Sequence, residues 1–262
     1  MNAKNMSPYL DQLFSLRDRV AVVTGGSSGI GRGIALALGQ VGAAVVLVAR
    51  DAARLAATVG ELEALDCRAA AVSADLGDRA DVERAGAAAA AAFGPPDILV
   101  NSAGLNLRPP LGQLTIGQFD ELIEVNLTAP FLLGQRFGPQ MADRGWGRII
   151  NITSQQADRA FGNSGGYGVA KGGVASLTRS QSEAWAPRGV CCNAICPGFV
   201  LTPLTAEASA DPARVAALAA RTMVGRNGLP DDFAGAAVFL ASPAARYVTG
   251  QVLSVDGGFS AT

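Results

Sequence analysis

The sequence predicts a single α/β domain, built on a doubly wound parallel sheet of about seven strands with helices on both faces. Three observations support this fold class. Short runs rich in β-branched residues alternate with Ala-rich stretches of helical length along the chain. The 262 residues suffice for one large domain, and no repeat or linker divides them. A hydrophobic fraction of 49% supplies a sizeable core, which excludes wholesale disorder.

The first 100 residues contain four apolar runs and three Ala-rich stretches between them. An extension (1–15) precedes the first run. Each Ala-rich stretch has the length of a helix, and Asp51 is placed to cap the second one. We expect strands at 20–23, 44–48, 68–73 and 98–100, and helices at 29–40, 52–65 and 78–93.

The second part of the chain continues the alternation. We expect strands at 148–152, 190–195 and 252–255, and helices at 115–143, 165–186 and 231–240. The segment 201–228 is polar and Ala-rich with a weak pattern, so we expect it to form a substrate-binding lid rather than part of the sheet.

Composition excludes several classes of function. Lys and Arg total 21 and Asp and Glu 22, a net charge of −1, so nucleic acid is not an expected partner. The absence of His excludes a Ser-His-Asp triad and His-ligated zinc, and we expect no metal site. The four cysteines form no CxxC pair and fit a reducing compartment. No signal-like or membrane-spanning apolar run occurs, so we expect a soluble cytoplasmic protein.

A glycine-rich turn follows the first predicted strand. It reads Thr-Gly-Gly-Ser-Ser-Gly-Ile-Gly over 24–31 and leads into a predicted helix. Glycines permit a tight turn and close approach of the backbone to a pyrophosphate, and the helix offers its unpaired N–H groups to that anion. The spacing Gly25-x-x-x-Gly29-x-Gly31 differs from the common G-x-G-x-x-G, but its position between strand and helix predicts a dinucleotide site.

The end of the second predicted strand bears on the choice of dinucleotide. An acidic residue there would bind the 2′-hydroxyl of NAD, but the strand ends Val48-Ala49-Arg50. The guanidinium of Arg50 is placed for the 2′-phosphate of NADP. A solvated surface charge is the alternative for Arg50.

Three further features indicate a reacting group. Tyr167 and Lys171 lie four residues apart in a predicted helix and project from one face, where the ammonium is expected to lower the pKa of the phenol. Ser154 follows a strand end, where a hydroxyl can contact a substrate carbonyl. Asn126 lies four residues before Pro130, which has no N–H to donate, so we expect a kink and a free Asn126 carbonyl that binds water. A packing kink is the alternative.

Together these motifs resemble the short-chain dehydrogenase/reductase family over residues 16–262. The shared motifs include Asn-Ser-Ala-Gly at 101–104, where Ser102 departs from the more usual Asn, and Pro197-Gly198. Ser154 precedes Tyr167 by the family's usual 13 residues. The resemblance implies a Rossmann-type fold, a homo-oligomer, commonly a tetramer, and an oxidoreductase that interconverts ketones and secondary alcohols by hydride transfer.

The resemblance also implies a role for each matching residue. Tyr167 would be the acid/base, Ser154 would polarise the carbonyl, Lys171 would hold the nicotinamide ribose, and Asn126 would hold a water. The family has two positions at which NADP users carry a basic residue. Arg50 fits one of them, but Ser28 occupies the other, so the expected preference for NADP(H) over NAD(H) depends on Arg50 alone. The other expected cofactor contacts are Gly25, Ser27, Ile30, Gly31, Asp75, Leu76, Asn101, Ala103, Gly104, Pro197, Gly198, Val200 and Thr202.

The sequence says less about the substrate than about the cofactor. Arg108 follows the Asn-Ser-Ala-Gly turn, in a stretch similar to that of gluconate 5-dehydrogenase-like members, and a guanidinium there suits a sugar acid. A surface position beside Pro109 is the alternative for Arg108. A 3-oxoacyl-carrier-protein reductase and a catalytically silent dinucleotide sensor are the alternative functions.

Overall fold

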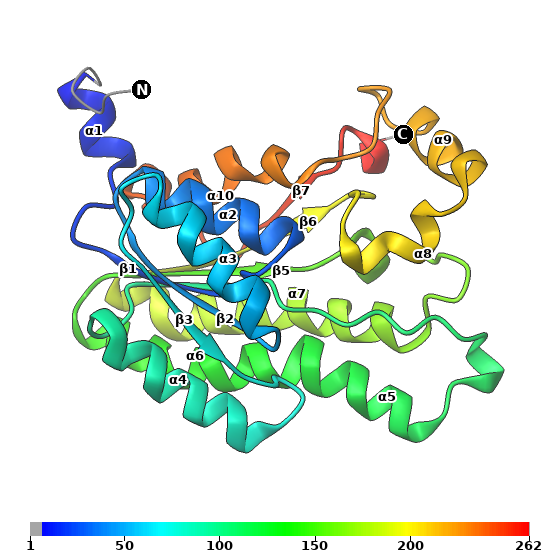
Figure 1. The fold of residues 1–262 in the computed structure, drawn as a ribbon, viewed down its shortest axis with the longest axis horizontal. Helices are drawn as coiled ribbons and strands as arrows, with labels where there is room; N and C mark the ends of the chain where they lie inside the picture. Colours follow the sequence, from blue (N-terminus) through cyan, green and yellow to red (C-terminus); the bar gives the residue numbers. More distant parts are fainter. Residues whose placement is uncertain (1–6, 262) are drawn as a thin grey trace.

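Seven parallel strands form one sheet in the order β3-β2-β1-β4-β5-β6-β7, as the computed structural model of residues 7–261 shows (Figure 1). Residues 1–6 of the expected extension and Thr262 lie outside the described residues. The predicted fold class is confirmed. The strands are β1 (Val20–Thr24), β2 (Ala44–Ala49), β3 (Ala69–Ser73), β4 (Ile98–Asn101), β5 (Gly147–Ile152), β6 (Val190–Pro197) and β7 (Val252–Val255).

Helices cover both faces of this sheet (Figure 1). None of those in residues 7–261 is long and apolar enough to cross a membrane. The α-helices are α1 (Pro8–Phe14), α2 (Gly29–Gln40), α3 (Ala52–Glu63), α4 (Arg79–Phe93), α5 (Ile116–Ile123), α6 (Ala129–Asp143), α7 (Gly165–Trp185), α8 (Ala206–Ser209), α9 (Pro212–Ala220) and α10 (Ala234–Ala241).

The alternation of side chains along each strand builds two separate cores. Ala21 and Val23 of β1 pack with apolar residues of α2, α3 and α10 on one face of the sheet. Val20 and Val22 pack with α4, α6 and the end of α7 on the other face. Strands buried on both faces require continuous apolar runs, which explains why the sequence predicts their positions closely.

The strand order reverses between β1 and β4, which start the two halves of the sheet. In doubly wound sheets a ligand crevice lies at such a switch point, beyond the carboxyl ends of the strands. The turns after β1 and β4 meet there. Thr24 Oγ1 accepts hydrogen bonds of 3.1 Å from the N–H groups of both Ser102 and Ala103.

The helix predicted over 115–143 is divided by one turn of π-helix, η3 (Glu124–Thr128), between α5 and α6. The N–H of Ala129 donates to the carbonyl of Glu124, five residues back. Pro130, in the first turn of α6, has no N–H to offer Asn126. The expected break therefore takes the form of a wider turn, a feature found frequently at functional sites.

The segment 201–228 folds into η6 (Pro203–Thr205), α8, α9 and a returning loop. Its base is closed, because the Leu201 N–H donates to the Gly228 carbonyl and the Gly228 N–H donates to that of Phe199. Figure 1 shows α8 and α9 projecting beyond the sheet, near the C-terminus. Neither helix has a buried residue. Both helices lie outside the two cores. Helix α8 is a single turn, and the apolar positions of α9 were not recognised within the Ala-rich segment.

Candidate active site

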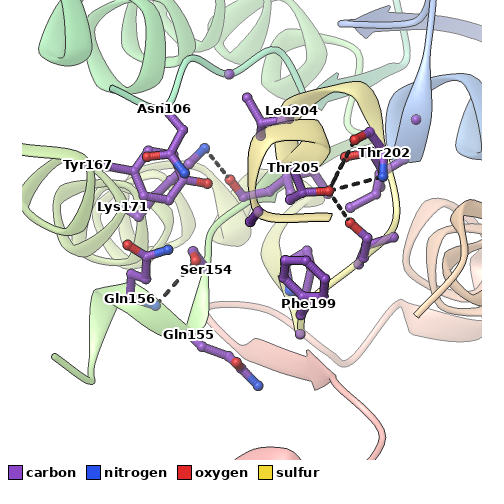
Figure 2. Close-up of a pocket in the computed structure, with 18 of the residues that line it drawn as sticks. Asn106, Ser154, Gln155, Gln156, Tyr167, Lys171, Phe199, Thr202, Leu204 and Thr205 are labelled. Carbon is purple, nitrogen blue, oxygen red and sulfur yellow. Dashed lines mark hydrogen bonds between the residues drawn. The ribbon is translucent and has the colours of Figure 1, made fainter. Parts of the chain in front are cut away.

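A cleft of about 340 Å³ opens beyond the carboxyl ends of the central strands. The glycine-rich turn, the turn after β4, the end of β5, helix α7 and the segment after β6 line it. In Figure 2, Ser154, Tyr167 and Lys171 lie on one side of the cleft, and Thr202, Leu204 and Thr205 on the other. Thirteen of the predicted site residues line it: Gly25, Ser28, Ile30, Gly31, Ala103, Gly104, Ser154, Tyr167, Lys171, Pro197, Gly198, Val200 and Thr202.

The glycine-rich turn is packed against the turn after β4. Gly25 has φ = +67°, a left-handed conformation, and a Cβ there would lie 2.9 Å from the Cα of Ala103. A Cβ on Gly31 would collide with the carbonyl of Gly25. These positions therefore require glycine, and they bring the backbone close to whatever occupies the cleft.

The N-terminus of α2 fits a dinucleotide pyrophosphate. Ser28 at its N-cap makes no side-chain capping bond, and the first turn carries no acidic residue. By contrast, the carboxylate of Asp51 caps α3 and that of Asp78 caps α4. The first N–H groups of α2 are thus left for an anion, and the dipole of the helix favours one.

The end of β2 carries a cation and no available carboxylate. Arg50 is exposed and takes part in none of the ion pairs within residues 7–261. Asp51 accepts a 3.0 Å hydrogen bond from the Arg54 N–H and lies 3.2 Å from the Arg54 Nε. The predicted capping role of Asp51 is therefore confirmed, and its carboxylate is occupied.

Tyr167 and Lys171 occupy successive turns of α7, and both are buried, with 6% and 4% of their surface exposed. The ammonium of Lys171 donates a 2.8 Å hydrogen bond to the carbonyl of Ile152 at the end of β5. It lies 5.6 Å from the centroid of the Tyr167 ring. Ser154 follows two residues after that strand, and its Oγ accepts a 3.2 Å hydrogen bond from the Gln156 N–H.

The pKa of Tyr167 differs from the sequence-based expectation. Burial raises the pKa of this phenol to about 12, while a hydrogen bond with Ser154 acts in the opposite direction. Burial also lowers the pKa of Lys171 to about 8. The prediction that Lys171 lowers the pKa of Tyr167 is thus wrong for the protein alone, because removal of water from the phenolate outweighs an ammonium already hydrogen-bonded to a carbonyl.

Asn126 is completely buried in the π turn. Its Nδ2 donates to the carbonyls of Leu105 (2.8 Å) and Leu122 (2.9 Å), and its Oδ1 accepts from the Leu105 N–H (3.2 Å). The side chain therefore fixes the loop that follows the Asn-Ser-Ala-Gly turn. Water binding at its backbone carbonyl stays a prediction.

Some predicted cofactor residues lie outside the lining of the cleft. Asn101 is buried, and its Nδ2 donates a 2.8 Å hydrogen bond to Asn151 Oδ1 inside the sheet. Asp75 is exposed and accepts from the Gly77 N–H, whereas Leu76 is buried. Ser27, Arg50 and Asn126 are likewise not among the lining residues. Contacts of these residues with a cofactor stay predictions.

A charged wall of the cleft lies beyond the Tyr167 phenol. Arg108 lines the cleft, and its Nη2 donates a 2.5 Å hydrogen bond to the carbonyl of Gly162. Glu207 of α8 and Arg214 of α9 line the same cleft. Neither Glu207 nor Arg214 was singled out from the sequence, where only segment 201–228 as a whole was expected to cover the substrate.

A family model described as enoyl-(acyl carrier protein) reductase matches residues 25–260, most of the chain. The chain belongs to the short-chain dehydrogenase/reductase family. It is 39% identical over 248 residues to gluconate 5-dehydrogenase of Gluconobacter oxydans, covering 95% of this chain and 97% of that protein. It is 40% identical over 250 residues to cis-4-hydroxycyclohexanecarboxylate dehydrogenase of Sinomonas cyclohexanicum, covering 93% and 97%.

Solved structures agree with this family. A gluconate 5-dehydrogenase from Burkholderia cenocepacia J2315, solved in complex with NADP and tartrate, superposes with a TM-score of 0.91. The two sequences are 36% identical, and the match covers 97% of this chain and 99% of the other. This short-chain dehydrogenase/reductase is therefore an oxidoreductase acting between hydroxyl and carbonyl groups, as the motifs predicted.

Proposed function

We propose that this short-chain dehydrogenase/reductase interconverts the secondary alcohol and the ketone of a small hydroxy acid, such as a sugar acid, with NADP(H) as cofactor. The observation that carries the substrate class is Arg108. Its guanidinium is partly buried in the cleft that holds Tyr167, and it pairs with no carboxylate within residues 7–261. A desolvated guanidinium without a counter-ion is suited to bind the carboxylate of a substrate.

Residues of the chain supply the proton and orient the substrate oxygen. When bound, the nicotinamide gives or accepts the hydride. Because the pKa of Tyr167 is raised to about 12, its phenol is protonated at neutral pH and can donate a proton to the oxygen of a ketone being reduced. The Ser154 hydroxyl donates a hydrogen bond to the same oxygen, and in oxidation the phenolate of Tyr167 takes the proton back.

Lys171 and Asn126 support this step. Lys171, fixed by the Ile152 carbonyl, would place its ammonium beside the ribose of the nicotinamide. Asn126 fixes the neighbouring loop, since its side chain accepts a hydrogen bond from the Leu105 N–H and donates one to the Leu105 carbonyl. The packing is close there, because a Cβ on Gly104 would lie 3.2 Å from Asn126 Oδ1. We assign to its backbone carbonyl the water that would connect Lys171 with solvent.

The preference for NADP(H) rests on Arg50 and Asp51. The free guanidinium of Arg50 would contact the 2′-phosphate, and the carboxylate of Asp51 is engaged by Arg54 and does not compete for a 2′-hydroxyl. The Burkholderia enzyme bound to NADP supports the same cofactor.

NADPH consumption, followed by its near-ultraviolet absorbance, tests this function. The panel holds a 5-keto sugar acid, a β-ketoacyl thioester, a vicinal diketone and a bulky aryl ketone, with NADH in parallel. We expect the keto acid to be reduced with the highest kcat/KM. Turnover of the thioester alone would instead identify a 3-oxoacyl-thioester reductase. Tight NADPH binding without turnover of any compound would favour a dinucleotide sensor.

Arg108→Leu tests the carboxylate contact. We expect the KM for the acid to rise at least about tenfold, because a charge-assisted hydrogen bond is lost, with kcat changed less. Arg246→Gln is the matched control, since Arg246 is exposed and does not line the cleft. An equal change in both variants would refute a specific role for Arg108.

A homo-oligomer and a cytoplasmic location complete the proposal. Phe131 of α6 and Val169 of α7 are exposed apolar side chains, 43% and 58% accessible, and members of the family are commonly tetramers built partly on the helix that carries Tyr167. Light scattering coupled to size exclusion would give the mass in solution, and a mass near the 26.6 kDa of one chain would refute the oligomer.

A further inference from the structure

Two guanidinium groups line the same cleft. Arg108 belongs to the loop after β4, and Arg214 to the first turn of α9, within the segment 201–228. Burial lowers the pKa of Arg108, and repulsion by Arg214 lowers this pKa further. Two like charges held close enough to repel raise the free energy of the empty cleft, and an anion placed between them lowers it.

Neither guanidinium is neutralised by an ion pair within residues 7–261. Glu207 of α8 lines the cleft too and attracts Arg108, but it is in none of those ion pairs. The wall formed by Arg108, Glu207 and Arg214 therefore carries a net charge of +1, from two cations and one anion. That charge matches a ligand with one carboxylate.

The two guanidinium groups differ in how firmly they are held. Segment 201–228 is attached where Val200 pairs with Gly228, and again beyond α9, where the Val224 N–H donates to the Gly257 carbonyl and Arg221 lies 4.1 Å from the centroid of the Phe259 ring. Arg214 is exposed, on a helix that buries no side chain. Its long side chain can therefore approach or leave a ligand at low free-energy cost, whereas Arg108 is held by the carbonyl of Gly162.

We propose that Arg214 is a second carboxylate-binding residue, whose side chain binds the acid group of the substrate together with Arg108. Glu207 restricts the site to a single carboxylate. This inference rests on the proposed hydroxy-acid function, and it names the residues that select the acid over the corresponding neutral polyol.

Calorimetric binding of two matched probes tests the proposal. D-Gluconate and D-glucitol share a carbon skeleton but differ in one carboxylate, and binding is measured with NADPH present so that neither is oxidised. We expect Arg214→Gln to raise the Kd of D-gluconate at least about tenfold and to leave that of D-glucitol unchanged. Arg246→Gln, which removes the same charge outside the cleft, should change neither.

Glu207→Gln gives an opposite and independent result. Removal of its negative charge should tighten binding of D-gluconate and of the dicarboxylate tartrate, with the larger gain for tartrate. An unchanged Kd for D-gluconate in Arg214→Gln, or an equal loss for D-gluconate and D-glucitol, would overturn the inference. A wild-type protein that binds D-glucitol as tightly as D-gluconate would instead overturn the hydroxy-acid function itself.

Discussion

The ammonium nitrogen of Lys171 lies 2.8 Å from the carbonyl oxygen of Ile152, the last residue of β5. This hydrogen bond fastens α7 to the sheet at the turn that follows Tyr167. It also directs the lysine charge toward a carbonyl rather than toward the phenol oxygen. The two largest influences on the pKa of Tyr167 are its burial, which raises the pKa, and its hydrogen bond with Ser154, which lowers it. A substitution at Ser154 removes the second influence alone.

The pH dependence of alcohol oxidation follows from this arrangement. Oxidation requires the phenolate of Tyr167, and a pKa raised to about 12 leaves this form scarce at neutral pH, so kcat/KM for oxidation should rise with pH. The Ser154 hydrogen bond favours the phenolate, so Ser154→Ala should move the rising limb to higher pH. A pH profile of both proteins measures the shift. A limb displaced to lower pH would contradict this prediction.

Tyr167→Phe removes the proton donor while keeping the ring that packs beside Lys171. We expect turnover to fall at least about a hundredfold, within the usual contribution of general acid–base catalysis. NADPH binding, followed by the cofactor's fluorescence, should remain nearly intact. Turnover equal to that of the wild type would exclude Tyr167 as the acid/base.

Arg50→Asp replaces the free cation at the end of β2 by a carboxylate. We expect the Kd of NADPH to rise far more than that of NADH, because only NADPH carries the 2′-phosphate. Arg246→Asp makes the same change of charge at an exposed position outside the cleft, and serves as the control. Equal effects of Arg50→Asp on the two cofactors would mean that Arg50 does not contact the phosphate.

Thr24→Val should destabilise the protein by about 1–3 kcal/mol, because it leaves the N–H groups of Ser102 and Ala103 without their acceptor. Thr24 is itself buried, so water does not replace it freely. Thr24→Ser keeps the hydroxyl and should cost less. Urea unfolding of both variants gives the two free energies. A Thr24→Val protein as stable as the wild type would contradict this role of the hydroxyl.

The sheet and its helices could be predicted closely because each buries an apolar face. Helix α2 begins and ends where expected, at Gly29 and Gln40, and β7 spans Val252–Val255 as predicted. Pro130 predicted a break near Asn126. It did not predict a π turn, because that form depends on the hydrogen bonds of all the residues in the turn and not on one missing N–H.

Residue type and spacing predicted that Ser154, Tyr167, Lys171 and the glycine-rich turn come together, and the structure places them around one cleft. Their roles in catalysis and cofactor binding stay predictions. Arg214 and Glu207 could not be found in this way. Both lie on helices that bury nothing, so only the folded chain reveals that they share a cleft with Arg108. The predicted direction of the Tyr167 pKa shift was wrong for a related reason. The burial that raises this pKa depends on neighbours from several elements, which the sequence does not place.

The pairing of Val200 with Gly228 gives segment 201–228 the character of an exchangeable module. Its two ends meet, and its bond from the Val224 N–H to the Gly257 carbonyl lies beyond α9, so changes in the length of α8 and α9 leave the register of β6 with β7 undisturbed. Doubling the length of such a loop costs only about 0.6 kcal/mol in closure entropy. The dinucleotide end of the cleft can thus stay constant in evolution while the segment is replaced, and grafting 201–228 from a relative is a direct way to transfer its substrate preference.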